Sequence, residues 1–404
     1  FLNATGEQDM NMALAANPGS NMWTEIDLEG VPLWWITIWE INDRLYEGDH
    51  DVVAEVVGHH EAIRIPDGRT IMLAEYAEID RSKEMECYHG VLDWYRILTT
   101  QYDTPLPLDR VQKVPQSNYD MVLEFAKDRS LSHVWKSSEN IYITQEEQDE
   151  YSYNVLYFNL LMLALEPIYY GDSTNDRTHS NAFFYDPTDD NLFISVRSQD
   201  RVYKLNWSGY HDEAQAVDRA PGEVIYNLRD FAIFDTDYNP ITLDYDNGVS
   251  FFSHQHCVEM YAVEGRPDLK LMTLFDNNNT PVMRNGNDYH SKALAAIVNE
   301  ARQEVVILFH RELPNFCFAL GTSQVLENGN FWYTCGTHDS KLGRSAIFGS
   351  HTTGYELSPD GDIIYSVGGY ATTYRAWRLR SLYGAVDYMP VKHKPLPIPA
   401  AWDV

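Results

Sequence analysis

Histidines at the starts of predicted hairpins are the residues of this sequence best placed to do chemistry. Three hairpins open with histidine, at His59 and His60, at His179 and at His256. A neutral imidazole can act as a nucleophile or a base near neutral pH, and a protonated one as an acid. In a closed array of sheets the first residues of the inner strands converge on one channel. The recurrence at one register therefore predicts a shared site, although each histidine alone fits an ordinary polar position at a strand edge.

The second hairpin carries two more polar residues that favour an anion site. Asn181 lies two positions after His179, on the same face of a regular strand, and Arg197 ends the returning strand. A guanidinium offers a planar set of donors to sulfate or carboxylate oxygens, and an amide adds a neutral donor. We therefore expect these three side chains to form an anion pocket.

Short strands joined by tight turns must position these residues. Inner hairpins are predicted at 59–75, 179–197, 256–277, 322–336 and 353–369. Asp-Gly and Asn-Gly pairs mark several of the turns, and further strand pairs follow some of the hairpins. A repeating unit of four strands is typical of a β-propeller.

The predicted fold is all-β, a single β-propeller domain over residues 1–404 with about six four-stranded blades. Strands at 34–41 and in the segment YRAWRLR are expected to complete one blade. Residues 1–30 are interpreted as an N-terminal extension. Residues 81–170 are interpreted as a partly helical insertion within the propeller, because polar and mixed stretches interrupt the strand pattern there.

The net charge of the chain limits the classes of molecule that it can bind. The chain has 30 Lys and Arg against 60 Asp and Glu, a net charge of −30. Such a field repels polyanions, so nucleic acid is excluded as a partner. No apolar run approaches the length of about 18 residues that a membrane helix needs. An anionic substrate would need a local cationic pocket, which Arg197 can supply.

Several features predict a secreted chain. It begins at Phe1, as a processed product would, and it has sequons at Asn3, Asn206 and Asn278 that predict glycosylation. The cysteines are Cys87, Cys257, Cys317 and Cys335, and they lack the paired spacing of a zinc site. Either Cys317 and Cys335 form a disulfide or all four are buried thiols, and the sequence leaves both readings open.

The hairpins resemble those of the arylsulfate sulfotransferase family. The segment HSNAFFYDPTDDNLFISVR is similar to the family's H-x-N…P…S-x-R segment, including the eighteen-residue separation of histidine and arginine. The segment FSHQHCVEM, followed by LFDNN, resembles the one that carries the sulfonylated histidine, which places His256 at that position. The likeness runs patchily from about residue 30 to residue 385. Glu61, Ser180 and Cys257 depart from the family's usual residues without removing a functional side chain.

The resemblance implies a double displacement that needs neither cofactor nor metal. His256 would take the sulfonyl group from an aryl sulfate and pass it to a phenol. Arg197 and Asn181 would bind the sulfonyl oxygens, and His179 and His60 would exchange protons with the two phenols. The implied partners are therefore a small-molecule aryl sulfate and a phenol.

Thr322 and His59 complete the set of candidate site residues. Thr322 matches a hydroxyl position of the family and is expected to bind substrate, unless it is an ordinary strand threonine. His59 is expected either to contact substrate or to face away as the neighbour of His60.

Two other functions stay open. A non-catalytic extracellular propeller, acting as a binding or structural module alone or in an assembly such as a homo-oligomer, would also fit the acidity and the repeats. A metal enzyme built on the hairpin histidines ranks last, because Arg197 beside them disfavours a bound cation.

Overall fold

Separate sheets of antiparallel strands make up most of the chain. The computed structural model describes residues 7–8, 22–26, 31–47, 57–65, 67–79, 116–142, 178–243, 251–279, 290–317, 319–338 and 351–378. Four larger sheets and one three-stranded sheet lie within these ranges. None of the helices found there is long and apolar enough to cross a membrane.

Each larger sheet follows the chain from its inner to its outer strand. The first contains β4 (Val57–Arg64), β5 (Thr70–Ile79), β6 (Gln116–Phe125) and β7 (Leu131–Lys136), and the second contains β8 (Ser180–Asp186), β9 (Asn191–Val196), β10 (Arg201–Leu205) and β11 (Val224–Asn227). The third contains β13 (His256–Val263), β14 (Arg266–Asp276), β15 (Lys292–Asn299) and β16 (Glu304–Glu312), with β12 (Ala232–Phe234) added in parallel beside β16. The fourth contains β17 (Thr322–Val325), β18 (Phe331–His338), β19 (His351–Leu357) and β20 (Ile363–Gly369).

The remaining elements are short. The N-terminal sheet contains β1 (Glu7–Gln8), β2 (Met22–Ile26) and β3 (Pro32–Thr37), and α2 (Ile38–Glu47) follows it. Single turns of helix are α4 (Ser137–Asn140), η3 (Arg197–Gln199), η4 (Ser208–Tyr210), η5 (Glu213–Ala216) and η6 (Leu228–Asp230).

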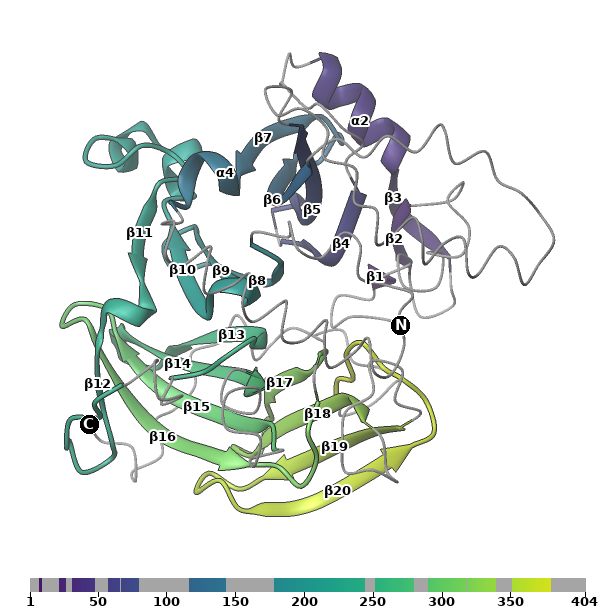
Figure 1. The fold of residues 1–404 in the computed structure, drawn as a ribbon. Helices are drawn as coiled ribbons and strands as arrows, with labels where there is room; N and C mark the ends of the chain where they lie inside the picture. The colour runs from purple at the N-terminus through teal and green to yellow at the C-terminus, as the bar shows by residue number, and fades with distance from the viewer. Residues whose placement is uncertain are drawn as a thin grey trace, which may run out of the picture.

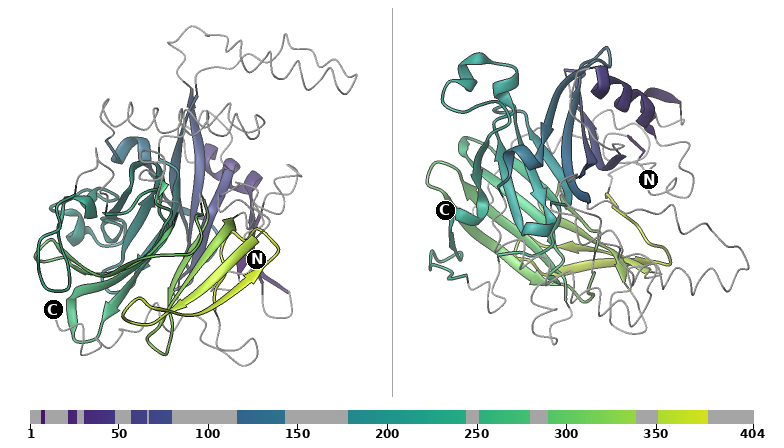
Figure 2. Two further views of the ribbon diagram at one scale, coloured as in Figure 1. Left: turned by 60° about the horizontal axis from the view of Figure 1, so that its bottom comes forward. Right: turned by 45° about the horizontal axis from the view of Figure 1, so that its top comes forward.

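The larger sheets are arranged as the blades of a propeller. Strands β4, β8, β13 and β17 lie nearest the centre, and β7, β11, β16 and β20 lie toward the periphery (Figure 1). The two views of Figure 2 show α2 beside the N-terminal strands and outside the centre. The prediction of an all-β propeller is therefore confirmed.

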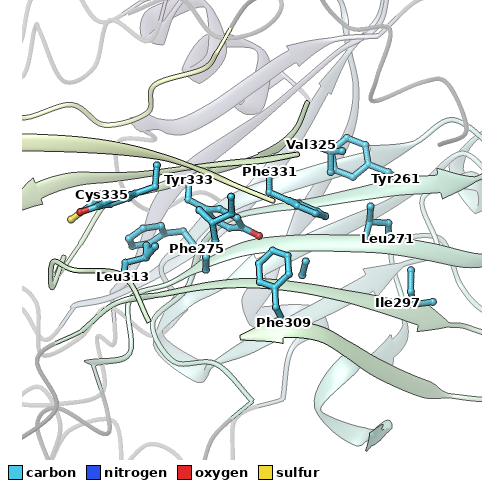
Figure 3. Close-up of a cluster of buried hydrophobic side chains, with 14 of the residues drawn as sticks. Tyr261, Leu271, Phe275, Ile297, Phe309, Leu313, Val325, Phe331, Tyr333 and Cys335 are labelled. Atoms are coloured by element: carbon cyan, nitrogen blue, oxygen red, sulfur yellow. The ribbon is translucent and has the colours of Figure 1, made fainter. Parts of the chain in front are cut away.

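The core lies between consecutive blades, and the third blade is buried on both faces. Along β15, Ala293, Ala295 and Ile297 face the fourth blade. The alternate residues of the same strand, such as Leu294 and Val298, face the second blade. Figure 3 shows the cluster between the third and fourth blades. Burial on both faces explains why β15 has a nearly continuous apolar sequence in place of simple alternation.

Two sequence expectations about blade composition need correction. Within the predicted insertion 81–170, residues 116–125 and 131–136 are the strands β6 and β7 of the first blade, and only α4 is helical among the residues described there. The predicted fifth inner hairpin is β19 and β20, the outer half of the fourth blade. The described ranges therefore contain four inner hairpins, and they leave the count of about six blades untested.

The strands expected to close a blade behave differently. The strand predicted at 34–41 ends at Thr37, the last residue of β3, and α2 begins at Ile38. The backbone nitrogen and the hydroxyl of Thr37 both donate to the carboxylate of Glu40, and these bonds cap the start of α2. Residues 1–30 include β1 and β2, which pair in one sheet with β3. Residues 374–378 of YRAWRLR form no strand and cross the centre, as described below.

In two of the three sequons the asparagine side chain is buried and donates hydrogen bonds to backbone carbonyls. Asn206 is buried, and its amide nitrogen donates to the carbonyls of Gln215, Arg219 and Ala220 at 2.9–3.2 Å. Asn278 is buried and donates to the carbonyl of His290. A glycan on either nitrogen would break these bonds, so the folded chain does not support glycosylation at these positions. Asn3 lies outside the described residues.

Cys317 and Cys335 form a disulfide, which settles the alternative that the sequence left open. It joins the loop after β16 to strand β18 within the core of Figure 3. Cys257 is a buried free thiol. Cys87 lies outside the described residues.

We expect reduction of this disulfide to lower the free energy of unfolding by about 2–5 kcal/mol, because the open chain gains conformational freedom when unfolded. Denaturant unfolding with and without reductant measures the change. A Cys317→Ser/Cys335→Ser variant should show the lower stability under both conditions, and Cys257→Ser should keep the response to reductant. Equal stability of the oxidised and reduced wild-type protein would contradict this expectation.

Candidate active site

Three of the inner strands depart from regular pairing where the candidate histidines lie. The register shifts between Gly58 and Ala62 in the first blade, between Ser180 and Ala182 in the second, and between His256 and Glu259 in the third. Bulges of this kind redirect side chains and are common beside active sites. They turn the polar residues of these hairpins away from the positions that simple alternation predicts.

Left-handed backbone accompanies each bulge. His60, His179 and Cys257 have φ of 60°, 48° and 52°. Such a conformation is uncommon for residues other than glycine and concentrates at functional sites.

His256 is buried at the start of β13 and is held through both ring nitrogens. Its Nδ1 lies 2.7 Å from Oδ1 of Asn277, and its Nε2 lies 3.2 Å from the backbone nitrogen of Leu320. The amide nitrogen of Asn277 donates to the carbonyls of Cys317 and Leu320, so its Oδ1 must be the acceptor facing His256. His256 therefore carries its proton on Nδ1 and directs the lone pair of Nε2 toward the Leu320 N–H.

The surroundings of His256 favour the neutral ring. Burial lowers its pKa well below the usual value, and the positive charge of Arg197 lowers it further. His179 and Arg375 act in the same direction, so all three lie near His256. A neutral imidazole with one free lone pair is the form that can attack an electrophile.

The disulfide loop fixes Asn277. The carbonyl of Cys317 accepts from Asn277 at 2.8 Å, and the backbone nitrogen of Cys317 donates to the hydroxyl of Ser291 at the same distance. A covalently tied loop thus orients Asn277, which in turn orients His256.

The residues just before His256 are bound to the second blade. The amide nitrogen of Gln255 donates to the carbonyls of Val196 and Arg201, on either side of Arg197. The backbone nitrogen of His254 donates to Asp200 at 2.6 Å. These bonds bring the start of β13 to η3, whose first residue is Arg197. The backbone nitrogen of Arg197 donates to the carbonyl of His179, which places both residues at one end of the second blade.

Asn181 bridges the second and third blades. Its amide nitrogen donates to the carbonyl of Gln255 at 2.6 Å. Its Oδ1 is buried, and no group in the described ranges donates a hydrogen bond to it. One of the two amide hydrogens makes the bond to Gln255, and the expectation that Asn181 donates to an anion stays a prediction.

His60 and His179 pack against each other. Their ring centroids are 5.1 Å apart at an interplanar angle of 77°, and Tyr374 lies 5.4 Å from His60. Both histidines are partly exposed. They lie beside the buried His256, where they can exchange protons with a bound molecule.

Residues 373–378 run across the centre and contribute a second cation. Arg375 is buried and pairs with Glu61 at 2.9 Å, and it donates to the carbonyl of Asn181 at 2.8 Å. The backbone nitrogen of Thr373 donates to the carbonyl of Gly336, where a side chain would collide with Thr373. Gly336 therefore permits the close approach of this segment to β18.

The structure describes the side chain of Thr322 but not that of His59. The hydroxyl of Thr322 accepts from the backbone nitrogen of Ala376 at 3.0 Å, so it anchors the C-terminal segment. The side chain of His59 lies outside the described part of the structure.

The structure thus gathers His256, Arg197, His179, His60 and Asn181, as the hairpin pattern predicts. It adds Asn277 and Arg375, which the sequence analysis did not select. Asn277 stands in the segment LFDNN, which was noted there for its family resemblance, and Arg375 stands in YRAWRLR, which was expected to complete a blade. Chemically, the group combines a neutral nucleophile, two guanidinium groups and two more imidazoles.

We expect His256 to remain neutral, with its proton on Nδ1, between about pH 6 and pH 8, because its pKa is depressed below the reference value of about 6.5. Nitrogen-15 NMR of the histidine rings reports both the charge and the tautomer. Asn277→Ala should yield mixed tautomers, and Asn277→Asp should favour the charged ring by placing an anion at Nδ1. The His351 signal should stay unchanged in both variants. A wild-type His256 that titrates near pH 6.5, or that carries its proton on Nε2, would overturn the assignment.

Comparison with known proteins identifies one family. The family model described as arylsulfotransferase (ASST) matches residues 96–363. This range is more than half of the chain and includes His179, Asn181, Arg197 and His256, whereas His60 and Arg375 lie outside it. Comparison with curated protein sequences gave no significant match.

Solved structures show only a weak likeness. Dihydro-heme d1 dehydrogenase NirN matches with 7% identity and a TM-score of 0.30, over 86% of this chain and 52% of that one. A europium-containing methanol dehydrogenase matches with 9% identity and a TM-score of 0.31, over 87% and 59%. A xylan β-1,4-xylosidase from Bacillus halodurans matches with 8% identity and a TM-score of 0.27, over 77% and 43%. The chain spans about half the length of these proteins, and such TM-scores carry no argument.

Proposed function

Because the chain belongs to the arylsulfotransferase family, we propose that it moves a sulfonyl group from an aryl sulfate to a phenol through a sulfohistidine at His256. Membership supports a transferase that acts on small aromatic substrates. The observation that carries the finer proposal is the state of His256, which is buried and holds its proton on Nδ1, the nitrogen bound to Asn277.

In the first step, Nε2 of His256 attacks sulfur. The new N–S bond forms as the bond from sulfur to the aryl oxygen breaks, and the phenolate leaves with the electron pair. Nε2 must first leave the N–H of Leu320, a single bond of 3.2 Å. The sulfonylated ring is cationic and keeps the proton on Nδ1. This N–H continues to donate its hydrogen bond to Oδ1 of Asn277. In the second step, a phenol oxygen attacks sulfur and returns the electron pair to Nε2.

Arg197 and Arg375 supply the positive field that the substrate requires. Both lower the pKa of His256, and Arg197 contributes more than Arg375, which is paired with Glu61. The same charges attract sulfonyl oxygens and favour departure of an anionic phenolate. Within a chain of net charge −30, this local pair is what admits an anion, since charges beyond about 8–10 Å in salty water are largely screened.

His179 and His60 are the proposed proton carriers. One would donate a proton to the leaving phenolate and later remove the proton of the accepting phenol, for a factor of about 10²–10⁴ in rate. Their edge-to-face packing keeps both rings at the same place beside His256, and it does not distinguish their roles.

Secretion is part of the proposal. The Cys317–Cys335 disulfide orients the loop that holds Asn277, and disulfides persist in oxidising compartments. An extracellular or lumenal enzyme would keep this bond.

We expect incubation with a chromogenic aryl sulfate to release phenol and to add the mass of one SO₃ group to a peptide containing His256. His256→Ala should lose both, since no other nucleophile occupies that position, and His351→Ala should retain both. Peptide mapping and the rate of phenol release measure the outcome. Full turnover by His256→Ala would refute the sulfohistidine. A folded protein that releases no phenol from a broad panel of aryl sulfates would favour the non-catalytic binding module.

Arg197→Ala should slow phenol release by about 10²–10³-fold, the usual cost of removing a group that stabilises developing negative charge. It should also shift the acid limb of the pH–rate profile to higher pH, because loss of the positive charge lets the pKa of His256 rise. Arg219→Ala, a change of an exposed arginine paired with Glu223, is the matched control and should alter neither. An unchanged acid limb in Arg197→Ala would separate Arg197 from His256.

A further inference from the structure

A second group of histidine and carboxylate side chains lies away from His256. Glu124, His133 and His211 each offer one ligand atom, and these atoms lie within 4.8 Å of one another. Glu124 and His133 are direct cross-strand partners on β6 and β7 of the first blade, and His211 follows η4 in the second blade. The turns that hold Arg69 and Asp190 border this group. Each turn ends the inner strand that begins at the His256 site, so the group lies at the opposite end of these blades.

The donor atoms have separations that suit a metal. Nε2 of His211 lies 3.1 Å from Oε1 of Glu124, and Nε2 of His133 lies 3.9 Å from the same oxygen. Ligands at about 2.0–2.2 Å from a tetrahedral ion are roughly 3.3–3.6 Å apart. Small movements of the His133 side chain would complete this geometry.

The contact between His211 and Asp190 is of a kind that metal-bound histidines make. Its Nδ1 lies 2.6 Å from Oδ2 of Asp190. The other oxygen of Asp190 accepts from Tyr185 at 2.8 Å and from Arg69 at 2.9 Å. A carboxylate that fixes the far nitrogen of a ligating histidine is a usual outer partner in zinc sites. This arrangement directs Nε2 of His211 toward Glu124.

Other contacts fix the remaining two donors. The ring of His133 stacks on Tyr210 at 4.6 Å. The second oxygen of Glu124 accepts from the indole of Trp207 at 2.8 Å and from Arg69 at 3.1 Å. These bonds leave Oε1 of Glu124 facing the two histidines.

The charge of the group also favours a cation. Three carboxylates, those of Asp67, Glu124 and Asp190, surround the single guanidinium of Arg69. Arg69 lies close to the His211 ring, with Nη1 at 2.7 Å from Nε2. A bound ion would replace this contact, while Arg69 keeps its bonds to the outward oxygens of Glu124 and Asp190.

We propose that Glu124, His133 and His211 bind one divalent transition-metal ion and so link the first blade to the second. Two imidazole donors favour ions such as Zn²⁺ over Mg²⁺ or Ca²⁺, which prefer oxygen. His211 is partly open to solvent, so a water molecule can fill the fourth position. The site shares no residue with the His256 site.

The test uses the full chain, freed of metal by a chelator and then titrated with Zn²⁺ in excess Mg²⁺, which occupies exposed carboxylates. Equilibrium dialysis with elemental analysis measures stoichiometry and affinity. We expect one tightly bound zinc per chain and a rise in the unfolding temperature on binding. The variants His133→Asn and His211→Asn should each lose the tight site, and Asp190→Asn should weaken it by about 10–100-fold. His351→Asn is the control and should bind as the wild type does.

Cobalt provides a second measurement that does not depend on stability. Co²⁺ bound by two imidazoles and one carboxylate should give the visible absorption of a four- or five-coordinate ion, and the band should disappear in His211→Asn. The proposal is overturned if the folded wild-type chain binds no zinc in excess Mg²⁺, or if a folded His133→Asn/His211→Asn variant binds it with unchanged affinity. Either result would show that the group is an ion-pair network between blades.

Discussion

The hydrogen bond between Nδ1 of His256 and Oδ1 of Asn277 is the interaction on which the candidate site depends. It decides which ring nitrogen keeps the proton and therefore which one can react. Much of the surrounding structure serves this bond, because Asn277 is held by the disulfide loop and the start of β13 is held by the second blade. A reactive position is thus specified by groups that never touch a substrate, as is common for buried histidines whose tautomer matters.

Local sequence patterns predicted most of the blade structure. Alternating residues and turn pairs located the hairpins β4–β5, β8–β9, β13–β14 and β17–β18. The same patterns misplaced β6 and β7, whose polar surroundings in the sequence resemble an insertion, and they ended the strand at 34–41 too late, since the Thr37–Glu40 bonds that start α2 depend on side chains. Assignment of hairpins to blades failed for β19–β20, because strand order in a sheet is a tertiary property that local alternation does not contain.

The sequence predicted which histidines lie at the site better than it predicted the contacts that hold the site residues. Recurring histidines identified His60, His179 and His256, but regular alternation did not predict the bulge between Ser180 and Ala182, which breaks the period of two at Asn181. Asn277 and Arg375 carry no local signal, because an asparagine after a strand and an arginine near the end of a chain are ordinary. Their importance arises from contacts with Cys317, Leu320 and Glu61, which only the folded chain brings near.

The segment that carries Arg375 gives the site an order of assembly. Arg375 reaches Glu61 across a sequence separation of 314 residues, and it also grips the carbonyl of Asn181. A ribosome-bound chain can therefore stack its early blades before Arg375 has been synthesised. At that stage the carboxylate of Glu61 has not yet formed its ion pair with Arg375. The centre gains its second guanidinium only after synthesis has passed β20, so a chain truncated before Arg375 lacks one of the two guanidinium charges that act on His256.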